Sequence, residues 1–510
     1  MRKICRVLFS RYMFCALAIL LEIALMFTLF VDLAKYSLSF IATWLVLSIL
    51  TVLRIVNQNT NPEFRLTWIV VVMCVPYIGI FLYFTLSRRK LSRKDSEIMR
   101  VVMHRPGMIG ESPVSLVAFS GRYQTYGGQV LSVIHDDPLA RLCSATRSDY
   151  YTMGADMYCD MLRDIKAAES FIFLEYFIIE KGVMWDEILA VLREKVKCGV
   201  DVRVIYDDIG CMSTLPSHYD RTLQRYGIKC CRFANVTPRV TIANNNRDHR
   251  KILVVDGKTA YTGGINIADE YIGERVRFGV WKDGGIRLEG EAVTVFTRMF
   301  LTAWELTTRE HEDISRYLDV CHSVPSDGGY YLPFGTGPAP VYSEHGGKNA
   351  LLNVINGSTR YLYITTPYLI IDFDLTEALQ CAARRGVDVR IITPGVPDKK
   401  IVNIMTKSSY YDLITAGVRI FEYTPGFLHM KSVVTDDGCA FVSTVNFDYR
   451  SLIHHFEDGV LIFGTDPVVK VRDGFLDTLA QSREIDANGA RLRFSDKIIK
   501  SCVRLFAPLL

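Results

Sequence analysis

Two segments of the chain carry the same set of reactive side chains at the same spacing. The members of the set are His249, Lys251, Asp256 and Asn266 in the first copy and His429, Lys431, Asp436 and Asn446 in the second. If Lys and Asp each fill about one position in twenty, the ten histidines of the chain should give roughly 0.03 such His-Lys-Asp matches by chance. The repetition therefore indicates a function that both copies share.

The spacing of these residues suits chemistry at a phosphate group. Side chains two positions apart on a strand point to the same face, so each histidine should lie beside its lysine, and the apolar residues that follow should bury the strand. An imidazole can attack phosphorus or carry a proton, and Lys and Asn can donate hydrogen bonds to phosphate oxygens. Two copies brought face to face would place two histidines on opposite sides of one phosphate. For Asp256 and Asp436, a direct role and a simple turn position after a strand both stay open.

The sequence around these motifs resembles the phospholipase D superfamily, and its context is similar to that of the bacterial cardiolipin synthases. The resemblance covers nearly the whole chain and is carried by residues 246–251, 261–266, 366–368, 446–451 and 507–510. It implies an α/β fold in which two similar halves, each a mixed sheet flanked by helices, form one pseudo-twofold catalytic unit.

The resemblance also implies roles for individual residues. One histidine attacks phosphorus to form a phosphohistidine, and the other protonates the leaving glycerol and then deprotonates the incoming hydroxyl. We assign His249 as the nucleophile and His429 as the acid and base, although the symmetry of the motifs leaves the order open. The lysines and asparagines of both motifs are expected to hold the phosphodiester oxygens.

Other residues enter through their positions in the family pattern. A carboxylate is needed to fix the tautomer of an imidazole, and the matching positions are Asp283 and Glu457. His455 stands where the family usually has Asn, which puts any carry-over to that position in doubt. The residues that match the family pocket are Glu175, Tyr176, Asp207, Asp208 and Tyr368.

Composition excludes several other classes of protein. A net charge of +4 over 510 residues is too small to indicate nucleic acid as a partner by itself. The thirteen cysteines include no Cys-x-x-Cys pair, so neither a zinc-ligand spacing nor a secreted disulfide framework is present. The sequence has no His-Glu-x-x-His motif and no phosphate-binding glycine loop, so we expect no metal and no cofactor, and activity in the presence of a chelator.

The N-terminal part is strongly apolar. Runs at 13–31, 36–53 and 66–86 approach the ~20 residues that cross a bilayer, which predicts a transmembrane region of two to three hydrophobic helices over 1–94. A signal peptide is the alternative for the first run. The basic cluster that ends at Lys94 should stay cytoplasmic and attract anionic lipids, although three full spans would put the basic N-terminus on the other face. We expect a protein of the bacterial cell membrane with a cytoplasmic catalytic part.

The rest of the chain divides into a connector and two halves. Residues 95–150 lack clear periodicity and predict a connector. The halves are expected at 151–325 and 326–510, and both carry the sequence Gly-Val-Asp-Val-Arg, at 199–203 and 386–390, within a strand-helix-strand pattern. The second half ends in an amphipathic segment, 491–506, which suits either a helix packed on its own domain or one lying in the membrane interface.

The resemblance to the bacterial cardiolipin synthases implies the same activity for this chain. It would transfer a phosphatidyl group between two phosphatidylglycerol molecules, giving cardiolipin and glycerol. Hydrolysis by water or transfer to another alcohol is the first alternative, because acceptor choice depends on the shape of the pocket, and an inactive membrane scaffold is the second. The partners expected are phosphatidylglycerol, cardiolipin and anionic membrane lipids, with no nucleic acid; the oligomeric state cannot be inferred from the sequence.

Overall fold

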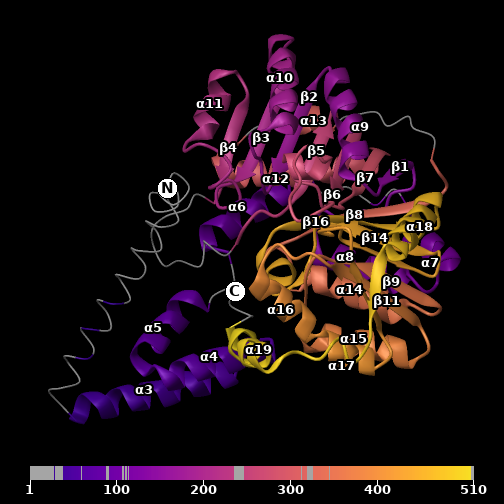
Figure 1. Ribbon diagram of the computed structural model, residues 1–510. Coiled ribbons are helices and arrows are strands. Elements are labelled where there is room, and N and C mark those ends of the chain that lie inside the picture. The colour runs from indigo at the N-terminus through magenta and orange to yellow at the C-terminus, as the bar shows by residue number, and fades with distance from the viewer. Residues whose placement is uncertain are drawn as a thin grey trace.

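The computed structural model shows two sheet-based halves and a helical N-terminal arm (Figure 1). It describes residues 38–506 apart from 59, 88–90, 106–107, 109–111, 113, 235–245, 312, 319–325 and 344, together with residues 24, 28 and 31. The two sheets differ by one edge strand and share the same internal order, as expected of a duplicated chain.

The first half contains a seven-stranded mixed sheet in the order β1-β7-β6-β5-β2-β3-β4. Its strands are β1 (Thr146–Tyr151), β2 (Phe171–Tyr176), β3 (Asp201–Asp207), β4 (Lys229–Phe233), β5 (Lys251–Val255), β6 (Thr259–Gly263) and β7 (Gly285–Gly290). Its helices are α9 (Gly154–Ala167), α10 (Val183–Lys197), α11 (Tyr219–Arg225), the 3-10 turn η2 (Asp269–Ile272), α12 (Ala292–Thr308) and α13 (Ser315–Leu318).

The second half contains an eight-stranded sheet in the order β17-β12-β11-β9-β13-β14-β16-β8. Its strands are β8 (Tyr330–Thr336), β9 (Tyr361–Thr365), β11 (Asp388–Pro394), β12 (Arg419–Tyr423), β13 (Ser432–Thr435), β14 (Cys439–Ser443), β16 (Glu457–Phe463) and β17 (Ser482–Ile485), and β10 (Leu369–Ile370) pairs separately with β15 (Phe447–Asp448). Its helices are α14 (Gly346–Gly357), α15 (Phe373–Arg384), α16 (Lys400–Ser408), α17 (Tyr410–Thr415), the π-turn η3 (Arg450–His454), α18 (Asp466–Ala480) and α19 (Phe494–Phe506).

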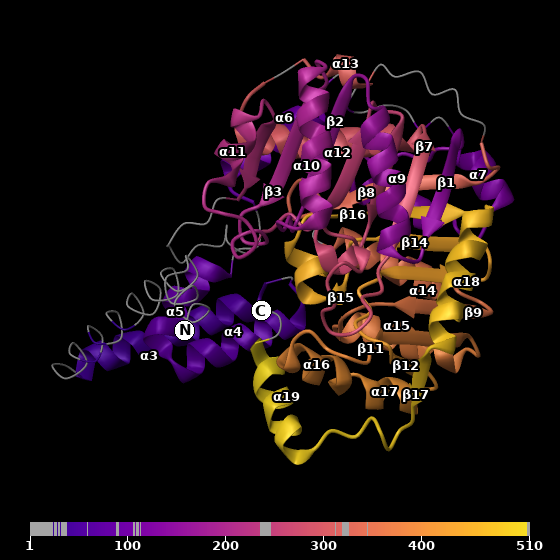
Figure 2. The same ribbon diagram turned by 45° about the horizontal axis from the view of Figure 1, so that its top comes forward.

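Both sheets are covered on two faces, which explains why their central strands are almost entirely apolar. In β2 alternate side chains take opposite directions: Phe171 and Phe173 join the core beneath α12, whereas Ile172 and Leu174 pack under α9 and α10. Figure 2 shows α9 and α10 lying over the strands of the first sheet. The core beneath α12 continues into the second half, so the two halves share buried apolar surface.

The segment predicted as a connector, 95–150, is largely helical and leads into the edge strand β1. It forms α6 (Arg93–Met103), α7 (Leu116–Arg122) and α8 (Gly127–Asp136) before β1 begins. The prediction missed α8 because Gly127 and Gly128 read as turn residues, while Val130 and Val133 of this helix are buried in the core of the second half. Tertiary burial here outweighs weak local propensity.

The N-terminal arm consists of α3 (Leu38–Val56), α4 (Pro62–Cys74) and α5 (Pro76–Leu86). The apolar run 66–86 is not one helix as expected, because Pro76 lacks the backbone N–H needed to continue α4 and instead begins α5. The run 13–31 falls almost wholly outside the described residues. Across the described residues, no helix combines the length and the apolar character that a membrane crossing requires.

The C-terminal helix α19 lies between the arm and the second half. The Thr67 hydroxyl of α4 donates a hydrogen bond to the Leu505 carbonyl at 2.6 Å, and Lys500 Nζ donates to the Ser408 carbonyl of α16 at 3.1 Å. One face of α19 therefore packs on the protein, which agrees with the first of the two interpretations given for the segment 491–506. The opposite face leaves Phe494 and Ile498 exposed.

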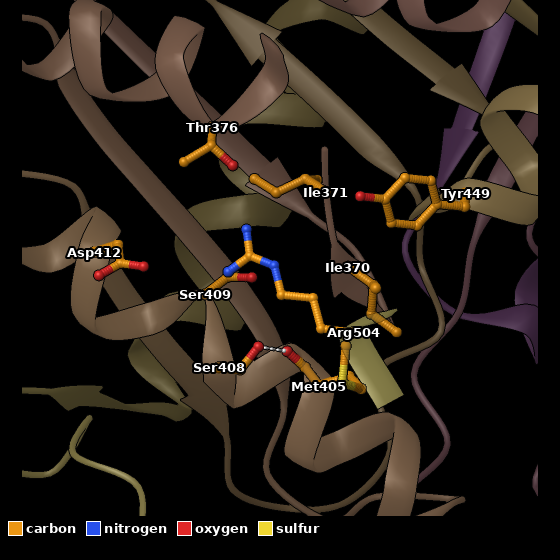
Figure 3. Close-up of a pocket in the computed structure, with 9 residues that line it drawn as sticks. All are labelled: Ile370, Ile371, Thr376, Met405, Ser408, Ser409, Asp412, Tyr449 and Arg504. Carbon is orange, nitrogen blue, oxygen red and sulfur yellow. Dashed lines mark hydrogen bonds between the residues drawn. The ribbon is translucent and has the colours of Figure 1, made fainter. Parts of the chain in front are cut away.

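A small pocket of about 40 Å³ lies at this junction (Figure 3). Its lining residues are Ile370, Ile371, Thr376, Met405, Ser408, Ser409, Asp412, Tyr449 and Arg504. Figure 3 shows the Arg504 guanidinium extending into the space between Thr376, Ser409 and Asp412. No motif residue lines it, so this pocket is separate from the paired histidines.

Candidate active site

Backbone pairing between the halves positions both motif histidines. The His249 amide donates to the Phe456 carbonyl at 2.8 Å, so a residue two positions before β5 is held by the residue before β16. In the same way, the His429 amide donates to the Lys282 carbonyl at 2.8 Å. Each histidine is thus fixed by a segment of the opposite half.

This pairing brings a carboxylate to each imidazole. His249 Nδ1 lies 2.8 Å from Glu457 Oε2, and His429 Nδ1 lies 2.6 Å from Asp283 Oδ2. Both carboxylates are fully buried. The structure therefore places the two residues predicted to orient the histidines beside them, with each contact crossing from one half to the other.

The environment keeps both imidazoles neutral. Burial lowers the pKa of His249 to about 4, despite the opposing charge of Glu457. Burial and the charge of Lys431 lower the pKa of His429 to about 4 as well. Burial alone would raise the pKa of Glu457, but its interactions with His249 hold it well below its usual range. A neutral ring that donates from Nδ1 to the carboxylate keeps the Nε2 lone pair for phosphorus or a proton.

Each motif lysine lies beside the histidine of its own motif. Lys251 Nζ donates to the His249 carbonyl, and Lys431 Nζ donates to the His429 carbonyl and lies 2.8 Å from His429 Nδ1. The charge of Lys431 also acts on the pKa of His249, and the charge of Lys251 acts on that of His429. Because each lysine affects the histidine of the other half, the two motifs converge on one electrostatic environment.

The two asparagines differ in their surroundings. Asn266 Oδ1 accepts from the Ile178 amide at 3.1 Å, and its Nδ2 donates to the Tyr271 hydroxyl at 2.7 Å. Asn446 is buried, and its Oδ1 has no hydrogen-bond partner among the described residues. Of the pair, Asn446 is therefore the one whose side-chain carbonyl oxygen, an acceptor, lacks a partner among the described residues.

Asp256 and Asp436 bond to backbone amides, which favours the turn position among the two interpretations left open for them. Asp256 accepts hydrogen bonds from the backbone amides of 169–171, and Asp436 accepts them from those of 359–361. Each lies at the far end of its strand, seven residues from its histidine, which is about 23 Å of extended chain at roughly 3.3 Å per residue. Both carboxylates fix the turn that precedes the neighbouring strand.

Glu175 and Tyr176 lie at the end of β2, next to the first motif. Glu175 forms an ion pair of 2.7 Å with Arg250, which also contacts Asp248 at 3.1 Å. Burial raises the pKa of Glu175 well above its usual value. Tyr176 is buried and pairs in register with Lys251. Glu175 thus belongs to a buried charge cluster behind His249, and its predicted contact with substrate is not supported by this placement.

The remaining predicted pocket residues have separate partners. Asp207 Oδ1 accepts from Arg247 at 2.7 Å and so anchors the segment that leads into His249. Asp208 contacts an arginine of β4 at 3.3 Å. Tyr368 donates to Asp398 at 2.8 Å. Asp207 is therefore the one of these residues that positions a motif.

Comparisons with known proteins agree with this geometry. The family model described as "Cardiolipin synthase, PLD-like domain" matches residues 161–280 and 351–478, and the model described as "Phospholipase_D-nuclease N-terminal" matches 46–88. A cardiolipin synthase of Alkalihalophilus pseudofirmus is 31% identical, with coverage of 93% of this chain and 96% of that protein. The chain belongs to the cardiolipin synthase family, within the phospholipase D superfamily.

Other relatives support the same membership. A cardiolipin synthase of a Geobacillus species is 32% identical over 89% of this chain and 90% of its own length. An uncharacterised protein of Streptococcus mutans is 39% identical over 90% of this chain and 99% of its own length. The crystal structure of a phosphatidylserine synthase from Haemophilus influenzae has a TM-score of 0.55 at 13% identity, covering 71% of this chain and 93% of that one, which shows a shared fold.

Sequence reasoning missed the aromatic walls of the site in this family member. The Phe177 ring lies 4.9 Å from the His249 ring, and the rings of Trp281 and Tyr271 each lie 5.7 Å from the His429 ring. A signal was present for Trp281, because it stands only two positions before Asp283, a residue predicted to orient a histidine. These rings shield both imidazoles from water.

Gly264 has no side chain, and the Asp283 carboxylate occupies the space that a Cβ would fill. A Cβ at this position would lie 2.0 Å from Asp283 Oδ1. We expect Gly264→Ala to displace the carboxylate from His429 and to reduce turnover by at least about 10-fold, since carboxylates that orient a histidine contribute on this scale or more. Steady-state kinetics would measure the loss.

The matched control is Gly128→Ala in α8, where an added Cβ meets nothing within 4 Å. It should retain full activity. Equal turnover in the Gly264→Ala and wild-type proteins, with both folded, would contradict the proposed requirement for space.

Proposed function

We propose that this chain is a cardiolipin synthase that transfers a phosphatidyl group from one phosphatidylglycerol molecule to the glycerol hydroxyl of another. The supporting observation is the pair of neutral, buried histidines, each held through Nδ1 by a carboxylate of the opposite half. The products are cardiolipin and glycerol. Because one phosphodiester replaces another, the exchange requires no nucleotide.

In the first step, His249 attacks phosphorus and the bond to the glycerol oxygen breaks. The electron pair leaves with that oxygen, which takes a proton from Nε2 of His429. Because this ring is neutral at rest, its Nε2 first takes up a proton, and the second step returns one to it. In the second step, His429 removes the proton from the hydroxyl of the second phosphatidylglycerol, whose oxygen displaces His249 from phosphorus. Lys251, Lys431 and Asn446 hold the phosphate oxygens during both steps.

The site must favour an alcohol over water as acceptor. The aromatic rings around both imidazoles support this, because excluding water protects a covalent intermediate from hydrolysis. Hydrolysis, or transfer to an alcohol other than phosphatidylglycerol, is the competing outcome that product analysis distinguishes.

We further propose that residues 1–94 anchor the protein to the bacterial cell membrane, with the catalytic halves on the cytoplasmic side. Exposed apolar side chains on the arm, including Leu45, Leu50 and Leu66, support contact with lipid. The exposed Phe494 and Ile498 of α19 lie on a helix that also carries basic side chains, which suits an anionic lipid surface.

The function is tested with the full-length protein in phosphatidylglycerol vesicles that contain a chelator. Mass spectrometry should find cardiolipin, with one glycerol released for each molecule formed. Phosphatidic acid as the main product would show a hydrolase, and a new phosphodiester formed only after adding a different alcohol would show another acceptor.

The lysines should make phosphodiester binding sensitive to pH. Burial lowers the pKa of Lys431 to about 7 and that of Lys251 to about 8. Both are charged below these values and lose charge above them. A charge-assisted hydrogen bond is worth about 1.5–3 kcal/mol, so affinity should fall by at least about 10-fold as the pH rises through this range.

Calorimetry would measure the affinity for glycerophosphoglycerol, which keeps a single charge over this range. The measurement uses the His249→Ala protein, because this variant cannot turn the ligand over. Lys431→Arg retains its charge and should remove the lower of the two transitions. If the affinity of the His249→Ala protein did not change with pH, the proposed binding of the phosphodiester by the two lysines would be wrong.

A further inference from the structure

His455 is a third histidine at the site, and the mechanism above does not use it. It is 8% exposed, and its ring centroid lies 5.5 Å from that of His249. Its Nδ1 lies 3.7 Å from Glu457 Oε1. Among the described residues, neither ring nitrogen of His455 has a hydrogen-bond partner, and neither does Glu457 Oε1. Three unsatisfied polar atoms are thus buried at one place, where such groups normally have partners.

The three side chains form a donor set for a metal ion. One donor atom from each of His249, His455 and Glu457 lies within 4.8 Å of the others. Two imidazoles and one carboxylate are the ligands of a common class of zinc site, in which the remaining position is open. The aromatic and backbone contacts around His249 hold this cluster in place without a metal.

The protonation states of these groups also suit a metal ion. Burial lowers the pKa of His455 to about 4, as it does for His249, so both rings are neutral near pH 7 and carry a free lone pair. Glu457 is ionised. No ligand has to lose a proton before it binds, which removes a usual cost of metal binding. The charges of Lys251 and Lys431 act on His249 and oppose a cation, whereas the charge of Glu457 favours one.

We propose that His249, His455 and Glu457 form an inhibitory site for a divalent transition-metal ion of the zinc class. The metal accepts the lone pair of His249, so this ring can no longer attack phosphorus. Coordination is reversible and transfers no group, and a chelator restores the free ring. The inhibition rests on the proposed function, whereas the binding of the metal does not.

Direct binding is tested first, with Zn²⁺ and Co²⁺ added to the purified full-length protein. X-ray absorption of one bound equivalent of Zn²⁺ should show imidazole and carboxylate ligands at about 2.0–2.2 Å. Sulfur ligands at about 2.3 Å would instead place the metal on cysteines and would overturn the proposal. This readout needs no variant and no enzymatic activity.

Variants locate the site. Co²⁺ should give visible absorption bands of a low-symmetry nitrogen and oxygen site, and His455→Asn should lose them and bind Zn²⁺ at least about 10-fold more weakly, since even residues that only support a metal ligand contribute on this scale. His454→Asn, the same change at the adjacent histidine, should bind like the wild type. Equal Zn²⁺ affinity of the His455→Asn and wild-type proteins would overturn the proposal.

Activity then tests the inhibition. Zn²⁺ should stop cardiolipin formation by the wild type, the chelator should restore it, and His455→Asn should resist the same concentration. Metal bound at this donor set without inhibition would overturn the inhibitory role alone. A protein that binds Zn²⁺ as described and makes no cardiolipin under any condition would instead refute the proposed function.

Discussion

His429→Ala is expected to release one equivalent of p-nitrophenolate per molecule from phosphatidyl-p-nitrophenol and then to stop. The first step on this substrate needs no acid, because p-nitrophenolate is a far weaker base than the alkoxide of glycerol. The second step still needs a base to activate the acceptor hydroxyl. The phosphatidyl group should therefore accumulate on His249, where mass spectrometry can find it.

His249→Ala is the matched variant and should release no p-nitrophenolate, because the nucleophile itself is absent. With phosphatidylglycerol as substrate, both variants should lose at least about 10³-fold in rate, since general acid–base catalysis alone contributes about 10²–10⁴-fold. The reverse pattern, with a burst from His249→Ala only, would exchange the two roles. Undiminished cardiolipin formation by either variant would refute both.

Glu457→Gln and Asp283→Asn should each reduce the rate by about 10³-fold, although neither residue touches phosphorus. A buried carboxylate holds its histidine in the productive tautomer and stabilises the charged ring, and an amide in its place can lower the rate by up to about 10⁴-fold. Because each carboxylate contacts the histidine of the opposite half, each substitution should impair the step that depends on that histidine. Glu457→Gln should impair the burst that depends on His249, whereas Asp283→Asn should leave the burst and slow the second step.

Asp256→Asn provides the control for these variants, because it removes a carboxylate that bonds only to backbone amides of 169–171. It should lower the melting temperature and leave the rate per folded molecule unchanged. Single-turnover kinetics and thermal unfolding separate these two effects. If Glu457→Gln impaired only the second step, the assignment of Glu457 to His249 would be wrong.

Local pattern was sufficient to predict much of the catalytic part. The continuous apolar runs of β2 and β5, the repeated Gly-Val-Asp-Val-Arg turns and the two motifs depend only on neighbours in sequence. Residues two apart in extended chain share a face whatever surrounds them, so His249, which leads into β5, and Lys251, which begins it, could be placed together in advance. The connector helices could not, because their stability comes from burial against distant elements.

The sequence alone determined that two histidine motifs exist, which strands carry them and which carboxylates accompany them. Only the tertiary structure decided that Glu457 serves His249 across 208 positions and that Asp283 serves His429 across 146. It also decided that Asp256 and Asp436 fix turns, and that His455 lies beside His249. The physical reason is that spacing along a strand sets the direction of a side chain, whereas its partner is set by how two sheets meet.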